Sequence, residues 1–203
     1  RNLQLRLTEL LREAPDLTFA GRDEEAAVAV RRLREIPDRA EDPLTDYVDA
    51  RLAADTGQLQ RALVLYTRGL TNAVAQQRGE LVPQIRAARG YTLLVLGRRD
   101  EALADMEQAR DAFKRANDWP SLARVFNDLA VERLSAGHLD DGEELLRQAL
   151  RATRLAFPDP RGGQGVTILT NLAEVAGVRG RPDVAIERDR EILGLARAST
   201  KTT

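Results

Sequence analysis

Residues 130–142 read AVERLSAGHLDDG and carry the pattern that decides the fold. A small residue, Ala130, is followed seven positions later by Gly137, and a second small residue, Gly142, comes five positions after that glycine. The same three-point pattern occurs five times in the chain. The other four instances are Ala14/Gly21/Ala26, Ala50/Gly57/Ala62, Gly90/Gly97/Ala102 and Ala173/Gly180/Ala185.

The spacing of the central glycines indicates a repeat protein. They lie at positions 21, 57, 97, 137 and 180, so successive glycines are 36, 40, 40 and 43 residues apart. Self-similarity with a period of roughly 20 to 50 residues is typical of solenoids, in which each unit buries its apolar face against its neighbours. The sequence therefore predicts an array of stacked supersecondary units.

Each glycine lies in a short break between two amphipathic helical patterns, where a residue that tolerates positive φ allows one helix to end and the next to turn back. Apolar residues follow helical spacing, and no sustained alternating pattern indicates strands. Prolines fall mostly between the pairs, although Pro15 interrupts the first helix of the first unit. The four regular predicted pairs are 44–56 with 59–77, 84–96 with 100–116, 121–136 with 140–156, and 166–179 with 182–198.

The predicted fold class is all-α, a right-handed α-solenoid of about five antiparallel helix pairs. We expect one repeat domain over residues 1–198, with a polar, disordered tail at 199–203. The chain begins with Arg1 instead of Met, so we expect it to be a piece of a longer protein. The predicted repeats are about 1–38, 43–79, 83–117, 121–157 and 165–198.

The small residues of the pattern have a packing role. Antiparallel helices approach to about 8–10 Å only where the side chains at their contact are small. A column of large apolar residues one turn further along each second helix is expected to fill the space between repeats, and Asp189 breaks that column in the last unit, as suits an uncovered end. The apolar members of the column are Val30, Tyr66, Met106 and Leu146.

Composition excludes several classes of function. The 203 residues include 31 basic and 32 acidic side chains, which leaves a net charge of −1 and no overall field toward nucleic acid or anionic lipid. The absence of cysteine rules out disulfides, thiolate metal sites and a cysteine nucleophile. No run approaches the roughly 20 apolar residues that cross a bilayer, and we expect a cytoplasmic protein.

No residue pattern indicates catalysis, a metal or a cofactor. His138, the single histidine, directly follows Gly137 and is expected to be a solvated turn residue. The segment RGGQG at 161–165 resembles a phosphate-binding loop but lacks the Lys-Ser/Thr ending and a preceding strand, so we interpret it as a linker between repeats. Trp119 is expected to anchor a loop. We therefore expect no enzyme.

The skeleton of small residues and turn glycines resembles the tetratricopeptide repeat family, in a variant with longer repeats similar to those of bacterial regulators. In that family the first helix of each pair lines a concave groove that receives peptides or protein segments. The resemblance implies that a partner-binding groove is lined by Tyr47, Arg51, Asp55, Gln84, Tyr91, Val95, Arg124, Asn127, Val131, Ser135, Thr170 and Glu174.

The resemblance implies a non-catalytic protein- or peptide-binding scaffold module of a multidomain bacterial signalling or transcription regulator. Two alternatives stay open: a sensor of a signal peptide or small metabolite that controls an attached output domain, and a homodimer formed through a terminal repeat. A clamp for an acidic chaperone C-terminus is disfavoured, because no lysine occupies the implied groove and only Asn127 matches by type. The sequence does not name the partner.

Overall fold

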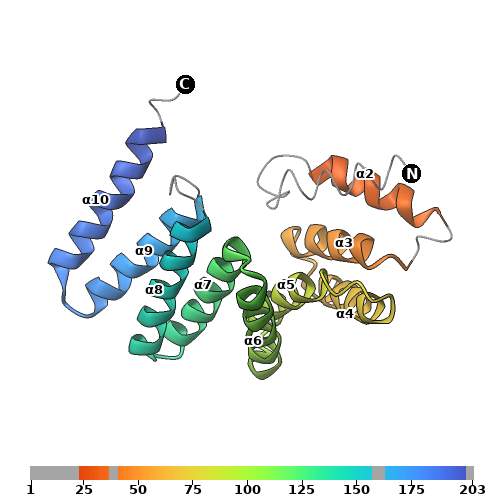
Figure 1. Cartoon of the computed structure of the whole chain (residues 1–203), viewed down its shortest axis with the longest axis horizontal. Coiled ribbons are helices and arrows are strands. Elements are labelled where there is room, and N and C mark those ends of the chain that lie inside the picture. The colour runs from red at the N-terminus through yellow and green to blue at the C-terminus, as the bar shows by residue number, and fades with distance from the viewer. Residues whose placement is uncertain (1–22, 37–40, 157–162, 200–203) are drawn as a thin grey trace. The chain divides into compact units, whose positions relative to one another are not determined.

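The computed structural model describes residues 23–36, 41–156 and 163–199 (Figure 1). Within these ranges the chain forms nine helices and no strand. The helices are α2 (Asp23–Arg34), α3 (Pro43–Asp55), α4 (Leu59–Ala75), α5 (Val82–Val95), α6 (Arg99–Ala116), α7 (Trp119–Ser135), α8 (Leu139–Ala156), α9 (Gly163–Val178) and α10 (Pro182–Ser199).

The chain divides into two compact units, residues 1–109 and residues 110–203, and the division falls within α6. In the first unit α3 packs on α4, and both α2 and α5 pack against this pair. In the second unit α7 packs on α8, α9 packs on α8, and α10 packs on α9. The single repeat domain over residues 1–198 stays a prediction.

The helices follow one another in the predicted pairs. Short turns join α3 to α4, α5 to α6, α7 to α8 and α9 to α10, and the paired helices run antiparallel (Figure 1). In the first predicted repeat, α2 is the second helix, while the expected first helix with Pro15 and Gly21 lies outside the described residues. The prediction of an all-α fold built from antiparallel helix pairs is confirmed.

The turn glycines have the backbone conformation that the sequence predicts. Gly57, Gly97, Gly137 and Gly180 have φ of +76°, +75°, +82° and +65°. Around Gly57 the amide of Gln58 donates to the carbonyl of Ala53 at 2.7 Å, and the amide of Gly57 donates to the carbonyl of Ala54 at 3.0 Å. These bonds satisfy carbonyls that the end of α3 would otherwise leave unpaired.

Two turns between pairs, after α4 and after α6, close in the same way without glycine. Gln77 after α4 and Asn117 after α6 have φ of +56° and +54°. The amide of Arg78 donates to the carbonyl of Ala73 at 2.8 Å, which repeats the bond that Gln58 makes after α3. In the described turns one closure therefore serves both kinds, with a glycine inside the pairs and a polar residue after α4 and after α6.

The small columns lie at close helix contacts. A Cβ on Gly90 of α5 would lie 2.7 Å from Cγ of Met106 on α6, and one on Gly142 of α8 would lie 2.5 Å from Cγ of Leu134 on α7. Real Cβ atoms do not approach other atoms so closely, so neither position has room for a larger residue. The alanines of the pattern that are fully buried are Ala50, Ala62, Ala102 and Ala130.

The column of large apolar residues is buried on the second helices α2, α4, α6 and α8. Tyr66, Met106 and Leu146 are at most 2% exposed, and Val30 is 5% exposed. Asp189, the corresponding residue of α10, is exposed. The large apolar residues of these four second helices are therefore core residues, and the acidic residue at the same position of α10 is exposed.

Most helix boundaries lie within two residues of their predicted positions, and the largest difference is at α9. This helix begins at Gly163 instead of 166, so residues 163–165 of the RGGQG segment belong to the helix and not to the expected linker. The predicted start of α7 at 121 was also late, because Pro120 occupies the first turn, where its missing amide hydrogen costs nothing. Ser199, expected in the tail, ends α10, and the other tail residues lie outside the described ranges.

Candidate partner-binding faces

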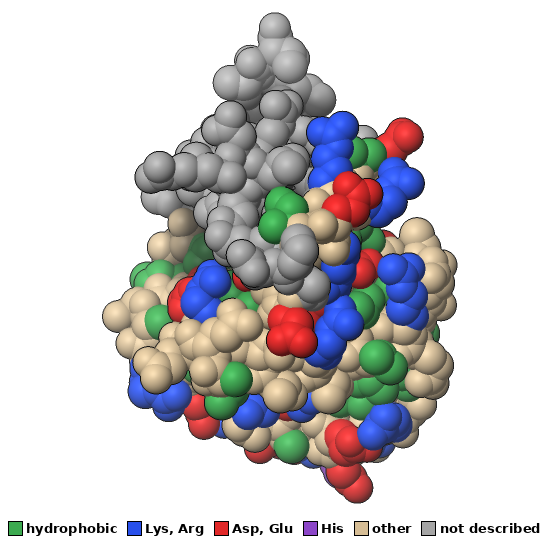
Figure 2. All heavy atoms as spheres, turned by 90° about the vertical axis from the view of Figure 1, so that its right-hand side faces the viewer, with side chains coloured by type: hydrophobic (Ala, Val, Ile, Leu, Met, Phe, Trp, Pro, Cys, Tyr) green, Lys and Arg blue, Asp and Glu red, His purple; other side chains and the backbone are tan. Residues whose placement is uncertain are grey.

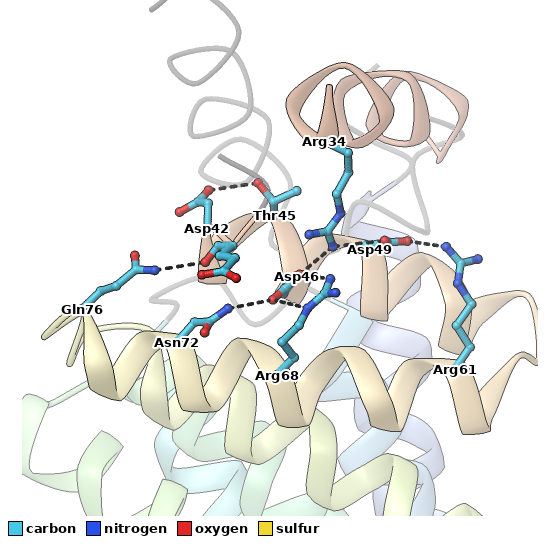
Figure 3. Close-up of polar contacts among 10 residues, drawn as sticks. Arg34, Asp42, Thr45, Asp46, Asp49, Arg61, Arg68, Asn72 and Gln76 are labelled. Atoms are coloured by element: carbon cyan, nitrogen blue, oxygen red, sulfur yellow. Dashed lines mark hydrogen bonds and ion pairs between the residues drawn. The ribbon is translucent and has the colours of Figure 1, made fainter. Parts of the chain in front are cut away.

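A polar cluster around Asp46 holds the first unit together. Its side chain is fully buried on α3 and accepts hydrogen bonds from Arg34 of α2 at 2.5 Å and from Arg68 of α4 at 2.6 and 3.0 Å (Figure 3). Asn72 of α4 contributes a longer contact of 3.5 Å. Because a buried carboxylate is costly without such partners, this cluster serves packing of α2, α3 and α4 and not chemistry.

Two similar carboxylates lie further along the chain. Asp105 of α6 accepts hydrogen bonds from Arg86 at 2.9 Å and from Arg89 at 2.6 and 2.9 Å, both on α5. Glu143 of α8 accepts a hydrogen bond of 2.5 Å from Arg147 of its own helix. It accepts another of 2.7 Å from Arg181, which lies at the turn before α10. Each carboxylate joins neighbouring helices, which leaves the faces turned away from these contacts as the candidates for partner binding.

In the first unit, the structure places Tyr47 of α3 in the core, where 7% of its surface is exposed. Its ring lies 6.2 Å from that of Tyr66, and the guanidinium of Arg51 lies over it, 5.9 Å from the ring centre. Arg51 is partly buried and Asp55 is exposed. Of these three implied groove residues, Arg51 and Asp55 therefore reach the surface, with Tyr47 beneath Arg51.

Helix α5 presents an exposed apolar face. Tyr91 and Val95, one turn apart, are 55% and 53% exposed. Gln84, two turns earlier, is partly buried, and its Oε1 atom is buried without a hydrogen-bond partner in the described part of the chain. We call these three residues the α5 face. The exposed apolar pair is suited to contact a polypeptide segment.

The second unit brings α7 and α9 together. Nδ2 of Asn171 on α9 donates a hydrogen bond of 2.9 Å to Oδ1 of Asn127 on α7. Val131 is 45% exposed and Arg124 is partly buried, so both reach the surface of α7 near this link. We call the surface of Arg124, Asn127, Asp128, Val131 and Asn171 the α7–α9 face.

The remaining implied residues of this unit are exposed. The hydroxyl of Ser135 donates to the carbonyl of Val131 at 2.8 Å, and that of Thr170 donates to the carbonyl of Val166 at 3.0 Å. Glu174 lies one turn after Thr170 on α9. Ser135 and Thr170 thus use their donors within the helix, and their oxygens remain able to accept from a partner.

Asp128 was missed by the sequence reasoning. It follows Asn127 on α7 and lies one turn after Arg124, on the same side of the helix. Burial raises the pKa of its carboxyl to about 6, against the opposing influence of the Arg124 charge and a hydrogen bond from Asn127. The helical spacing of Arg124 and Val131 brackets position 128, so a complete count of that face would have included it.

Other candidate chemistry finds little support in the described residues. His138 is exposed in the turn after Gly137, and Trp119 is partly buried at the start of α7. The described ranges contain no group of three histidine or carboxylate side chains that could hold a metal ion. None of their helices is long and apolar enough to span a bilayer. On the face shown in Figure 2, basic and acidic side chains are interspersed, without a basic patch that would attract nucleic acid.

Known proteins resemble the chain mainly in fold. BtubC (BKLC) from P. vanneervenii superimposes with a TM-score of 0.70 at 19% identity, over 98% of this chain and 84% of that one. MamA (41-end) from Desulfovibrio magneticus RS-1 has a TM-score of 0.62 at 21% identity, over 97% and 94%. A putative kinesin light chain with TPR-like repeats from Podosopora anserina has 0.66 at 18%, over 97% of each chain. No curated protein matches the sequence.

The family comparison agrees with the glycine pattern. The tetratricopeptide repeat model matches residues 83–155, which contain α5 to α8 almost completely and the turn glycines Gly97 and Gly137. Repeats of this family are scaffolds for protein interaction. Residues 83–155 are therefore similar to tetratricopeptide repeats, and the helix pairs and turn glycines of the other described residues follow the same pattern.

Proposed function

We propose that this chain is a non-catalytic scaffold that binds a peptide or protein segment on the exposed faces of its first helices. The observation that carries the proposal is the exposure of Tyr91 and Val131. Both lie six residues before a turn glycine, so they occupy the same position in successive repeats. They are 55% and 45% exposed, although burial of an apolar side chain of this size would stabilise the folded chain.

The polar residues of these faces suit a polypeptide partner. Gln84 lies two turns from Tyr91 on α5 and is partly exposed. Arg124 and Asn127 lie one turn apart on α7 and offer donors close to Val131. Aromatic and arginine anchors surrounded by amide groups are typical of surfaces whose binding energy is concentrated in few residues.

Peptides selected by the protein itself provide the test. A library of random peptides displayed on phage is selected against the chain, and a selected peptide is titrated by fluorescence anisotropy. We expect Tyr91→Ala or Arg124→Ala to weaken binding at least tenfold, as anchors at the centre of an interface do. Matched controls are Val64→Ala, an exposed apolar residue on α4, and Arg151→Ala, an exposed arginine on α8.

Both outcomes of this titration are informative. A loss with Tyr91→Ala or Arg124→Ala, with the two control variants unchanged, supports binding on the first helices. Equal affinity for all four variants would remove the assignment of the binding surface. Circular dichroism of each variant checks that the helices are retained.

The proposal also concerns the kind of protein to which these repeats belong. We infer that the module belongs to a multidomain bacterial signalling or transcription regulator in the cytoplasm, on the basis of its long repeats, with glycines 36 to 43 residues apart. In that setting the bound segment changes the activity of an attached output domain. The full-length gene product tests this inference, because a DNA-binding, cyclase or kinase segment beside the repeats is expected.

A further inference from the structure

Helix α10 presents an exposed stripe with an unusual symmetry. Ile186 and Leu193 are 50% and 54% exposed, and Asp189 and Arg190 between them are exposed as well. These four residues follow the spacing i, i+3, i+4, i+7, so they lie along one side of the helix. We call them the α10 stripe. Apolar residues occupy both its ends and a pair of opposite charges occupies its centre.

The opposite side of α10 contacts the rest of the second unit. Glu191 accepts a hydrogen bond of 3.0 Å from Arg154 of α8, and Arg188 pairs with the same carboxylate at 3.0 Å. Positions 188 and 191 lie about half a helical turn away from the α10 stripe. The contact with α8 therefore fixes the orientation of the helix and turns the stripe outward.

We propose that the α10 stripe pairs with the same stripe of a second copy of this chain. In a two-fold symmetric, antiparallel pair of helices centred between positions 189 and 190, Ile186 of one copy lies opposite Leu193 of the other. The same register places Asp189 opposite Arg190, and symmetry repeats each contact. Apolar groups thus meet apolar groups, and each carboxylate meets a guanidinium, at all four contacts.

Charge complementarity selects a second copy as the occupant. A symmetric interface must be complementary to itself, and the order apolar, acidic, basic, apolar along α10 satisfies this condition in the antiparallel register only. A parallel pairing would place Asp189 against Asp189 and Arg190 against Arg190, which is repulsive. Because the surface spans only two helical turns, the dimer is expected to be weak.

Charge reversal and its rescue give the decisive test. Analytical ultracentrifugation of the wild-type chain between about 5 and 500 μM is expected to show a monomer–dimer equilibrium in this range. Asp189→Arg alone, or Arg190→Asp alone, should weaken the dimer at least tenfold, because like charges then face each other twice. The double variant Asp189→Arg/Arg190→Asp should restore wild-type affinity within about threefold, since the exchanged pair is again complementary.

A covalent test fixes the register independently of affinity. The chain has no cysteine, so Ile186→Cys combined with Leu193→Cys introduces the only two thiols. Within one helix their Cα atoms are about 10 Å apart and cannot form a disulfide, whereas the proposed register places them opposite each other across the dimer. The matched control is Val64→Cys with Thr71→Cys, an exposed pair of the same spacing on α4.

The results separate this proposal from the proposed function. Covalent dimers of the α10 variant, with none of the α4 control, together with rescue by the double charge exchange, support the α10 pairing. A monomeric wild-type chain at every concentration, or a dimer that the charge reversals leave unchanged, would overturn it. Neither result affects peptide binding on α5 and α7, because no residue of the α10 stripe belongs to those faces.

Discussion

Gly142 of α8 approaches Leu134 of α7 so closely that a Cβ on the glycine would lie 2.5 Å from the leucine Cγ. Helix propensity alone favours alanine over glycine by about 1 kcal/mol inside a helix. Here the close contact opposes that preference, because Leu134 and the carbonyl of Ala130, at 3.3 Å, would both have to move. Packing, and not helix formation, therefore determines the residue at position 142.

We expect Gly142→Ala to lower the free energy of unfolding by about 1–3 kcal/mol, the usual cost of overpacking a tight contact. Gly177→Ala is the matched control, because a Cβ on this exposed residue of α9 would meet nothing within 4 Å. That variant should raise stability by a few tenths to about 1 kcal/mol. Urea unfolding followed by circular dichroism measures both changes, and effects of equal sign would contradict the packing argument.

A second prediction concerns the stability effect of Gln77, whose φ is positive. A residue with a Cβ in the left-handed conformation costs about 1–2 kcal/mol relative to a relaxed backbone. Gln77→Gly should therefore stabilise the first unit by about 0.5–1 kcal/mol, after allowance for the larger entropy of glycine in the unfolded chain. Gly97→Ala, where φ is +75°, should lower the melting temperature instead. A loss of stability in Gln77→Gly would show that the side chain, and not the backbone, governs this turn.

Because Asp46 is fully buried, we expect its removal to cost more stability than removal of the neighbouring Asp49. Asp46→Ala leaves Arg34 and Arg68 without their buried carboxylate, so we expect it to destabilise the chain by about 2–4 kcal/mol. Asp49→Ala removes a neighbouring carboxylate that pairs with Arg61 at 2.8 Å and with Arg34 at 3.3 Å, but Arg34 keeps Asp46, so its cost should be smaller, at about 1 kcal/mol. Chemical denaturation compares the two variants. Similar losses would mean that burial of the Asp46 carboxylate contributes little.

Asp128 predicts a dependence on pH with the opposite sign to that of most carboxylates. Burial raises its pKa to about 6, so the folded chain holds this proton more tightly than the unfolded chain does. The resulting stabilisation is present at pH 4 and below, and it is lost as the pH rises from 4 through 6. Asp128→Asn should thus be more stable than the wild type by about 1–3 kcal/mol at pH 8 and similar to it at pH 4.

Thermal unfolding of both chains between pH 4 and pH 8 tests this expectation. Glu144→Gln is a suitable control, because Arg151 and Gln148 lower the pKa of that exposed carboxyl by hydrogen bonds. A constant difference between Asp128→Asn and the wild type across the range would contradict the raised pKa. A residue that lowers stability at neutral pH and lies beside Arg124 and Asn127 is a good candidate for partner contact.

The fold could be predicted because its rules are local. A positive φ at Gly137 and a lack of space at Gly142 act within a few residues of each other, so they leave a fixed spacing in the sequence. The start of α9 could not be placed, because Gly163 and Gly165 resemble a linker in isolation. Gly165 is buried in the structure, so packing of the helix decides the conformation there.

The candidate faces were harder to predict than the fold. The offset from the turn glycine identifies the side of each first helix, but it does not show which side chains neighbouring helices cover. Tyr47 is covered and Tyr91 is exposed, although both were assigned by the same rule. The Asn127–Asn171 link joins residues 44 positions apart and depends on how α9 packs beside α7, which no local pattern specifies.

The described turns share one pattern of closing hydrogen bonds, and this has a consequence for the gain or loss of whole hairpins. The described turns close with bonds between residues three to five positions apart, whether glycine, Gln77 or Asn117 occupies the left-handed position. A hairpin duplicated or deleted as a whole would bring its own junction with it, and the flanking hairpins would need no new turn. Variation in the number of hairpins is therefore compatible with the turns that the structure describes.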